Sequence, residues 1–360
     1  MKEEIKIEGR PYRVSEIGSL SLSDLKTVRD SETASKAIAF IKEFFGGSQA
    51  ISVKTSGSTS APKTFFIPKA AMLKSAELTG RALGWGDLSG LNALLCLSPD
   101  KIGGMMCIVR AYLFGFNLII GRVSSHPFSD IKEDVHYTSV VPYQLYSELE
   151  YGKSTALSSL RWVLVGGGAV SRELEALCPL LKNACVYHTF GMTETGSTIA
   201  LRRISPKREE SFSPLQGVSL STDDRGCLVV SAPYLPSSPL ITNDIVSIEK
   251  DGSFRWIGRY DNIINTGGVK IHAEKLEEKI SGILGEKCAV TAIKDIGLGE
   301  KIVLVLESKV RNSDEIKAKL RGRLNRYEIP KEVLVGFSIP EAANGKIDRK
   351  ALKAAVAEGN

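Results

Sequence analysis

The sequence predicts an α/β fold in which a large N-terminal domain, with a doubly wound sheet and a β-hairpin region, precedes a small α+β C-terminal domain. Strand and helix patterns alternate from about residue 35 to 190, hairpin patterns follow residue 210, and a new α+β pattern begins near Asp261. Repeated β-α-β order is typical of a doubly wound sheet. The predicted domains are residues 1–260 and 261–360, and the second has the size of a small independent domain.

The elements of the first domain follow the order that a parallel sheet requires. Short continuous apolar runs indicate strands that are buried on both faces. Pro142 suits the first turn of a helix, and Ser171 is a residue type that caps one. The predicted strands are 91–97, 117–120, 137–141 and 184–191, with a helix over 103–115, a helix from Pro142 and a strand–turn–helix over 161–181.

The pattern changes in the last third of the chain. Two hairpins are predicted over 217–235 and 244–259, and Asp251-Gly252 forms the turn of the second. The segment 259–268 then interrupts the strand pattern. Beyond it the sequence predicts helices over 274–283 and 313–326, strands over 288–293, 301–307 and 332–338, and a C-terminal helix just after the turn that holds Lys346.

Composition and charge exclude several classes of protein. Hydrophobic residues make up 43% and charged residues 24%, which is ordinary for a globular protein, and no apolar run predicts a membrane span or a signal peptide. The six cysteines form no CxxC pair, so we expect neither a zinc site nor disulfides and predict a cytoplasmic protein. The net charge of +6 is spread along the chain without basic and aromatic interleaving, so no nucleic-acid partner is predicted. The oligomeric state, monomer or homodimer, stays open.

Residues 54–64, KTSGSTSAPKT, have two interpretations. Composition alone favours a solvated linker. However, the segment follows a short apolar strand over 50–53, and backbone N–H groups, hydroxyls and Lys63 could together hold phosphate. The segment is not an ordinary P-loop, because Pro62 stands where the second glycine would be.

Three further residues carry possible chemistry, and each also has a plain structural interpretation. Glu194 could hold Mg²⁺, which takes oxygen ligands, or could belong to a helix-capping Thr-x-x-Glu turn. Asp244 could bind ribose hydroxyls or simply occupy a turn. Lys346 could reach into a site of the other domain and neutralise developing charge, or could be an exposed lysine beside a glycine.

Taken together, these segments resemble the acyl-adenylate-forming superfamily, which includes acyl-CoA synthetases, luciferases and adenylation domains. The resemblance covers roughly residues 50 to 352 and implies a phosphate loop, two domains joined by a hinge, and the use of ATP, Mg²⁺ and coenzyme A with a small carboxylic acid. The six matching motifs, in the family's order, are TSGSTSAPK (55–63), GGGA (166–169), FGMTE (190–194), TND (242–244), GRYDNIINTGGVKI (258–271) and NGKIDR (344–349).

The resemblance implies a role for each matching residue. The ATP phosphates would contact Thr55, Ser56, Gly57, Ser58, Thr59 and Lys63. Adenine and ribose would contact Gly167, Gly168, Ala169, Phe190, Gly191, Asp244 and Arg259. Thr193 and Glu194 would serve phosphate and Mg²⁺, and Lys346 would orient the acyl carboxylate during adenylation. Asp261 would be the hinge, about which rotation would bring Gly267, Gly268 and Lys270 to the site or to coenzyme A.

The sequence departs from the family pattern at several positions. Ser60 and Asn243 replace glycines, and Ala273 replaces a common proline. The segment before residue 54 is much shorter than the N-terminal subdomain of most members, so a compact variant is expected. None of these changes removes a charged reactive group.

The acid substrate is indicated by two segments. Residues 97–104 and 140–145 resemble those of the o-succinylbenzoate-CoA ligases of menaquinone biosynthesis, and Lys101 stands where that branch has histidine. Lys101 could pair with the second carboxylate of o-succinylbenzoate, or could be a plain loop lysine; Gly104 and Thr195 would complete the acid site. Another acyl-CoA ligase, a carrier-loading adenylation enzyme and a non-catalytic nucleotide-binding protein are the alternatives, and the retained Lys346 argues against the last.

Overall fold

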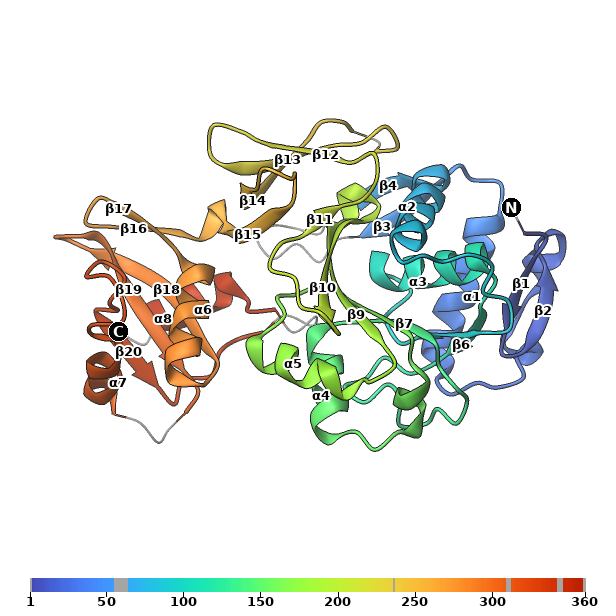
Figure 1. Ribbon diagram of the computed structural model, residues 1–360, viewed down its shortest axis with the longest axis horizontal. Coiled ribbons are helices and arrows are strands. Elements are labelled where there is room, and N and C mark those ends of the chain that lie inside the picture. The colour runs from blue at the N-terminus through green and yellow to red at the C-terminus, as the bar shows by residue number, and fades with distance from the viewer. Residues whose placement is uncertain (1, 55–63, 236, 309–311, 342–345, 359–360) are drawn as a thin grey trace.

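The computed structural model describes residues 2–54, 64–235, 237–308, 312–341 and 346–358 (Figure 1). A large mixed sheet forms the centre of the N-terminal part. Strands β9, β8, β7, β5, β6 and β1 are parallel neighbours, and antiparallel strands lie at both edges. The chain passes from β5 to β6 on one side and then crosses back to β7 on the other side of β5, which confirms the doubly wound sheet. In spatial order the strands are β11 (Ser213–Pro214), β10 (Ser197–Ser205), β9 (Cys185–Met192), β8 (Trp162–Val165), β7 (Tyr137–Val140), β5 (Asn92–Leu95), β6 (Asn117–Ile120), β1 (Glu4–Ile7) and β2 (Arg10–Arg13).

Helices cover both faces of this sheet because its strands bury alternate side chains on opposite faces. Leu95 and Leu118 pack in the core shared with α1, α2 and α3, whereas Leu94 and Ile119 pack in the core shared with α4 and α5. Ser171 caps α5 as predicted, its hydroxyl accepting a hydrogen bond from the Leu174 N–H. The helices are α1 (Ser31–Phe45), α2 (Lys69–Ala82), α3 (Ile102–Phe114), α4 (Pro142–Tyr151) and α5 (Arg172–Leu177).

Two antiparallel units flank the central sheet. Strands β3 (Ala50–Lys54) and β4 (Thr64–Pro68) pair with each other, with Lys54 opposite Thr64. The predicted hairpins form a second sheet of β12 (Ser219–Thr222), β13 (Cys227–Ser231), β14 (Leu240–Ile248) and β15 (Phe254–Arg259). Strand β15 then runs through a short 3₁₀ turn at Tyr260–Asn262 into the C-terminal part of the chain (Figure 1).

Residues from 263 onward build a separate sheet with its own core. Helices α6 and α7 pack on one of its faces and α8 on the other. The strands are β16 (Ile263–Thr266), β17 (Val269–His272), β18 (Cys288–Asp295), β19 (Gly299–Leu306) and β20 (Glu332–Val335), and the helices are α6 (Ala273–Leu284), α7 (Ser313–Leu320) and α8 (Arg349–Glu358).

The structure corrects the sequence prediction in three places. The helix predicted over 313–326 ends at Leu320, because Arg321 leaves the helical conformation and Gly322 has a φ of +78°. The segment 259–268 does not merely interrupt the pattern, because it includes β16 and the turn to β17. The hairpin of β1 and β2, which precedes the predicted start of the α/β pattern, joins the central sheet through β6. Within the described ranges, no helix is long and apolar enough to cross a membrane.

Candidate active site

The strand–turn segment FGMTE is built around a close backbone approach. Gly191 on β9 lies opposite Thr198 on β10, and a Cβ atom at Gly191 would overlap the Ser197 carbonyl oxygen and lie 2.6 Å from its carbon. The chain then turns through a 3₁₀ segment, Thr193–Thr195, which ends at Gly196 with a φ of +63°. Only glycine fits at residue 191, so the close approach of β9 and β10 explains the glycine of the FGMTE motif.

Replacing Gly191 with alanine is therefore expected to lower the free energy of unfolding by about 2–4 kcal/mol, because rigid backbone atoms cannot move away from the new methyl group. Urea denaturation would measure the change. Gly86→Ala is the matched control, since open space surrounds that glycine, and its effect should stay within about 0.5 kcal/mol. Equal midpoints for the two variants would contradict this account.

The acidic turn at Thr193–Thr195 lies beside the strand that follows the predicted phosphate loop. A Cβ atom placed on Gly196 would lie 3.8 Å from the Ile67 side chain on β4. Thr193 and Glu194 are partly exposed, and Glu194 pairs with no cation among the described residues. Thr195, by contrast, is fully buried, and its hydroxyl lies 2.6 Å from the Ser197 carbonyl and accepts from the Met192 N–H. Through these hydrogen bonds Thr195 shapes the turn. The predicted phosphate residues 55–63 lie outside the described residues; Lys54 and Thr64 on either side of them are paired.

The glycine turn after β8 is held from behind by a histidine. Gly167 has a φ of +79°, which favours glycine, and Ala169 is exposed. His188 on β9 has its Nε2 atom 3.0 Å from the Gly168 carbonyl oxygen. Burial and the neighbouring Arg202 lower the pKa of His188 to about 4, so the ring is neutral at neutral pH. Neutral His188 can donate to Gly168 and accept from Arg202, and it thereby positions the turn.

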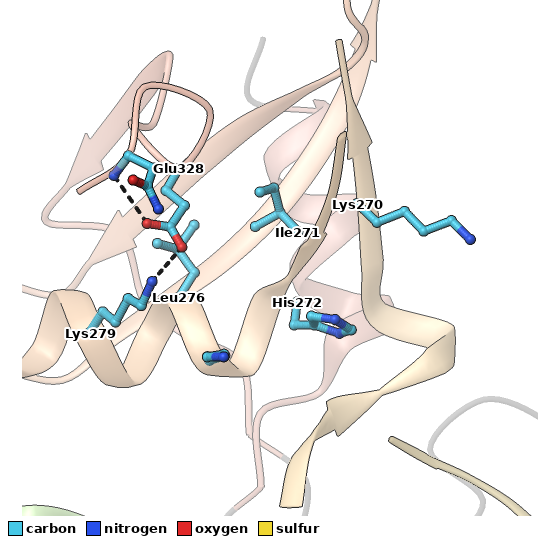
Figure 2. Close-up of a pocket in the computed structure, with 8 residues that line it drawn as sticks. Lys270, Ile271, His272, Leu276, Lys279 and Glu328 are labelled. Atoms are coloured by element: carbon cyan, nitrogen blue, oxygen red, sulfur yellow. Dashed lines mark hydrogen bonds and ion pairs between the residues drawn. The ribbon is translucent and has the colours of Figure 1, made fainter. Parts of the chain in front are cut away.

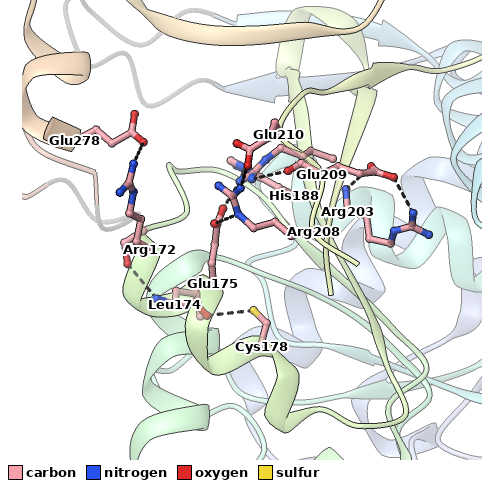
Figure 3. A network of polar contacts seen from close by, with 12 residues as sticks. Arg172, Leu174, Glu175, Cys178, His188, Arg203, Arg208, Glu209, Glu210 and Glu278 are labelled. Atoms are coloured by element: carbon pink, nitrogen blue, oxygen red, sulfur yellow. Dashed lines mark hydrogen bonds and ion pairs between the residues drawn. The ribbon is translucent and has the colours of Figure 1, made fainter. Parts of the chain in front are cut away.

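Charged residues behind this histidine form the network drawn in Figure 3. Glu175 on α5 accepts from Arg202 at 2.6 Å and from Arg208 at 2.6 Å. Both Arg202 and Glu175 have side chains that are only 9% exposed, so the pair is buried and each charge depends on the other. The network therefore ties α5, β9 and β10 together behind the glycine turn.

The predicted ribose residues meet at the paired ends of β14 and β15. Asp244 and Arg259 are register partners, and the Arg259 Nη1 atom lies 3.8 Å from Asp244 Oδ2. The indole N–H of Trp256 donates to Asp244 Oδ1 at 2.9 Å, which fixes the carboxylate and leaves Oδ2 directed toward Arg259. Sequence reasoning missed Trp256. Its register partner is Val246, two residues from Asp244, and nothing in the sequence of β15 indicates that its indole bonds to that carboxylate.

Lys346 comes to the same place from the far end of the chain. Asp244 and Arg259 are the charged groups that act on its ammonium, the first stabilising the charge and the second opposing it. Lys346 is an exposed residue, yet the protein atoms crowded around its ammonium remove water, and this desolvation lowers its pKa. A lysine more than 80 residues away from Arg259 in sequence thus lies beside the predicted ribose pair.

The segment that carries Lys346 is anchored by a bidentate ion pair that sequence reasoning missed. Arg349 at the start of α8 donates to both carboxylate oxygens of Glu277 on α6 at 2.6 Å, and also to the Val290 carbonyl at 3.0 Å. A bidentate pair fixes orientation as well as distance. The arginine of NGKIDR therefore anchors the start of α8, three residues after Lys346, to α6 and β18.

The predicted thioester loop lies elsewhere in this arrangement. Gly267 and Gly268 form the turn between β16 and β17, and a Cβ atom placed on Gly267 would lie 3.4 Å from the Leu298 side chain in the turn between β18 and β19. Lys270 on β17 lines a pocket of about 250 Å³ together with His272, Lys279 and Glu328. Figure 2 shows the Lys270 side chain pointing away from the Lys279–Glu328 ion pair. The structure thus brings Lys346, and not Lys270, to Asp244 and Arg259.

Two residues of the predicted acid site lie at the start of α3. A Cβ atom at Gly104 would overlap the Ser98 carbonyl oxygen, so glycine allows the loop and helix to approach closely. Lys101 precedes the helix as its N-cap residue and is exposed. The neighbouring Asp100 pairs instead with Lys36 on α1, at 2.9 Å.

Arg110, in the third turn of the same helix, was not predicted from sequence. It is only 2% exposed, and its guanidinium lies 3.1 Å from the Thr198 hydroxyl and 3.5 Å from those of Tyr137 and Thr79. No carboxylate among the described residues pairs with it, and its Nε atom has no hydrogen-bond partner there. A buried cation without a counter-charge is costly unless something else compensates it. Because Thr198 lies opposite Gly191, this cation sits directly behind FGMTE.

A magnesium ion would have few protein ligands here. In the described part of the chain no group of three or more His, Cys, Asp or Glu side chains could hold a metal. Glu194 alone offers a carboxylate at the acidic turn. That is compatible with Mg²⁺, which usually keeps several waters and is held through one or two carboxylates and substrate phosphates.

The sequence is similar to one protein family and to several named enzymes. Residues 49–226 match the family described as AMP-binding enzyme. The chain is 26% identical to 2-succinylbenzoate–CoA ligase of Bacillus mycoides, over 90% of this chain and 74% of that protein. It is 28% identical to the probable 2-succinylbenzoate–CoA ligase of Mycobacterium tuberculosis, over 84% and 83%.

Two solved structures extend the comparison. An AMP-forming acyl-CoA synthetase/AMP-acid ligase II-like protein of Dyadobacter fermentans has a TM-score of 0.60 and 32% identity, covering 91% of this chain and 95% of that one. The o-succinylbenzoate coenzyme A synthetase of Bacillus subtilis, in complex with ATP and magnesium ion, has a TM-score of 0.72 at 23% identity, covering 84% and 69%, and supports the fold. The chain therefore belongs to the AMP-binding enzymes of the acyl-adenylate-forming superfamily.

Proposed function

We propose that this chain is an AMP-forming acid–CoA ligase whose acid is o-succinylbenzoate. One observation carries the proposal: Lys346, from the C-terminal unit, stands beside Asp244 and Arg259 of the β14–β15 hairpin. A cation delivered by a separate unit to a carboxylate suited to ribose hydroxyls matches the needs of adenylate formation. The relatives named as 2-succinylbenzoate–CoA ligases support the choice of acid.

The reaction would proceed in two steps at one site. An oxygen of the substrate carboxylate attacks the α-phosphorus of ATP, the bond from that phosphorus to the bridging oxygen breaks, and pyrophosphate leaves. The sulfur of coenzyme A then attacks the acyl carbon, AMP leaves, and the thiol proton passes to water. In the first step Lys346 would hold the carboxylate against the phosphate, and Asp244 would hold the ribose. Mg²⁺, held through Glu194, would neutralise charge on the phosphates.

The two steps need different surfaces, so we also propose that residues 261–360 move as a unit about Asp261. In the present arrangement Asp244 and Arg259 act on the ammonium of Lys346, whereas Gly267, Gly268 and Lys270 lie at the turn and strand of another hairpin. Rotation would exchange the first set for the second, as lids and domains do in other enzymes.

Arg110 gives the substrate assignment a structural basis. o-Succinylbenzoate has two carboxylates, and only one is activated. The buried guanidinium behind FGMTE lacks a protein carboxylate among the described residues, so the second substrate carboxylate is a suitable counter-charge. Lys101 is the other candidate, but it is exposed at the N-terminal end of α3.

The proposal is tested by ATP–pyrophosphate exchange with o-succinylbenzoate, benzoate and short fatty acids. Exchange should be fastest with o-succinylbenzoate, and product formation should then depend on coenzyme A. A faster exchange with another acid would reassign the substrate, and product formed only on a carrier protein would reassign the thiol.

The six cysteines, all within the described residues, are free thiols, which supports a reducing compartment such as the cytoplasm.

A further inference from the structure

The hinge residue is held by side chains that the family motif does not contain. Asn243 replaces the glycine of the Thr-Gly-Asp motif, and its Nδ2 atom donates to Asp261 at 3.1 Å and 3.3 Å from the two carboxylate oxygens. On its other side, Arg225 Nη1 donates to Asn243 Oδ1 at 3.1 Å. Glycine at this position could make neither bond.

The chemistry of the amide explains why asparagine suits this place. Arg225 can only donate, and the ionised Asp261 can only accept, so a neutral bridge between them must do both. The Asn243 amide does so in one orientation, with its oxygen toward Arg225 and its nitrogen toward Asp261. Aspartate here would repel Asp261, and a hydrocarbon side chain would bond to neither.

Arg225 is itself well placed to serve as the fixed end of this bridge. Its guanidinium is anchored by Asp223 at 2.8 Å, donates to the Thr242 carbonyl at 3.2 Å, and lies 5.1 Å from the centre of the Tyr260 ring. Tyr260 belongs to the hinge turn, so Arg225 contacts the hinge directly as well as through Asn243.

The bridge continues to the ribose pair. Asp261 also accepts from Arg259 Nη2 at 2.7 Å, and Arg259 faces both Asp244 and Lys346. The chain Arg225–Asn243–Asp261–Arg259, named here the hinge clasp, thus connects the β12–β15 sheet to the pivot and to the groups that meet Lys346. A rotation of the backbone at Asp261 would turn its carboxylate away from Asn243.

We propose that Asn243 and Arg225 are positioning residues that hold the hinge in the arrangement that serves adenylate formation. The inference rests on the proposed two-step function. The clasp favours the arrangement with Lys346 at the site and has to open before the thiol step. Its hydrogen bonds lie at the surface, where their contribution is modest, so its effect is a bias between two arrangements and not a lock.

The test compares Asn243→Ala with Arg255→Ala, a control that removes an exposed ion pair to Glu249 on the same sheet without touching the hinge. Pre-steady-state release of pyrophosphate should slow by about tenfold in Asn243→Ala, as expected for two lost hydrogen bonds. Reaction of presynthesised acyl-adenylate with coenzyme A should keep or exceed its normal rate. Asn243→Asp should slow the first step further, and high salt should partly restore it.

A second measurement does not depend on activity. Hydrogen exchange of the backbone over residues 256–266, followed by mass spectrometry without substrates, should quicken in Asn243→Ala and stay unchanged in Arg255→Ala. Equal slowing of both half-reactions, or unchanged exchange, would overturn the clasp. If no acid supports adenylate formation in the unaltered protein, the proposed function fails, and the exchange result alone decides whether the clasp holds the hinge.

Discussion

Replacing Lys346 with alanine is expected to slow adenylate formation by about a hundredfold to a thousandfold, the usual loss when a group that stabilises transition-state charge is removed. The ammonium stands beside Asp244 and Arg259, where the nucleotide and the acid would meet. Pyrophosphate release in the first turnover would measure the loss. Presynthesised acyl-adenylate should still react with coenzyme A at nearly its normal rate, because Lys346 would have left the site before that step.

The exposed Lys350, four residues further along, provides the matched control. Lys350→Ala removes the same charge from the same segment and should leave both half-reactions unchanged. Loss of the thiol step in Lys346→Ala, or survival of the adenylation step, would show that the assigned role is wrong.

The pH dependence of the first step gives Lys346 a second signature. Desolvation and Arg259 lower the pKa of this lysine, while Asp244 opposes the shift. Only the ammonium form can hold the carboxylate, so the adenylation rate should fall as pH rises through a value below the ordinary lysine pKa of about 10.4. This alkaline decline should be absent from the residual activity of Lys346→Ala.

The fold could be predicted well where one segment carries its own signal. Continuous apolar runs such as 118–120 belong to strands buried on both faces, and the alternation of Leu94 and Leu95 between two cores explains why such strands are uniformly apolar. The hairpin of β16 and β17 was missed because its residues include Asn265, Thr266 and two glycines, which resemble a loop. Its pairing depends on partners and not on local hydrophobicity.

The site was less accessible to sequence reasoning, because its residues converge from distant segments. Nothing local predicts that Lys346 meets Asp244; the expectation came from the family resemblance alone. Asn243 was a departure without a role until its contacts with Asp261 were seen. Arg110 lies 88 residues from Thr198, and in the sequence it is one arginine within an apolar helix. Its lack of a carboxylate partner among the described residues can be seen only in the folded structure.

That arginine leads to a prediction in which activity and stability change in opposite directions. Arg110→Met should lower kcat/KM for o-succinylbenzoate by about a hundredfold, the effect of losing a charge-assisted contact worth about 1.5–3 kcal/mol. The rate with benzoate, which lacks the second carboxylate, should change by less than about threefold, since a missing contact cannot affect a substrate that never makes it.

Stability should move the other way, because the native protein buries a guanidinium whose partners are hydroxyls at 3.1–3.5 Å. Those hydroxyls have other contacts: Tyr137 with Ser139 at 2.8 Å, and Thr79 with the Ser75 carbonyl at 2.8 Å. Replacing an uncompensated buried charge with an apolar side chain of similar length is then expected to leave the free energy of unfolding unchanged or to raise it by about 1–2 kcal/mol. Urea denaturation would measure it, with the exposed Arg81→Met as control.

Lys101→Ala decides between the two candidate cations for the second carboxylate. If Lys101 binds that group, its removal should raise KM most for dicarboxylic acids, and Arg110→Met should not discriminate between o-succinylbenzoate and benzoate. If Arg110 binds it, the pattern reverses. If Arg110→Met is less stable and its kcat/KM falls equally for both acids, the arginine serves packing. If the variant is more stable and its kcat/KM falls only for the dicarboxylic acid, the buried charge serves substrate binding at a cost in stability.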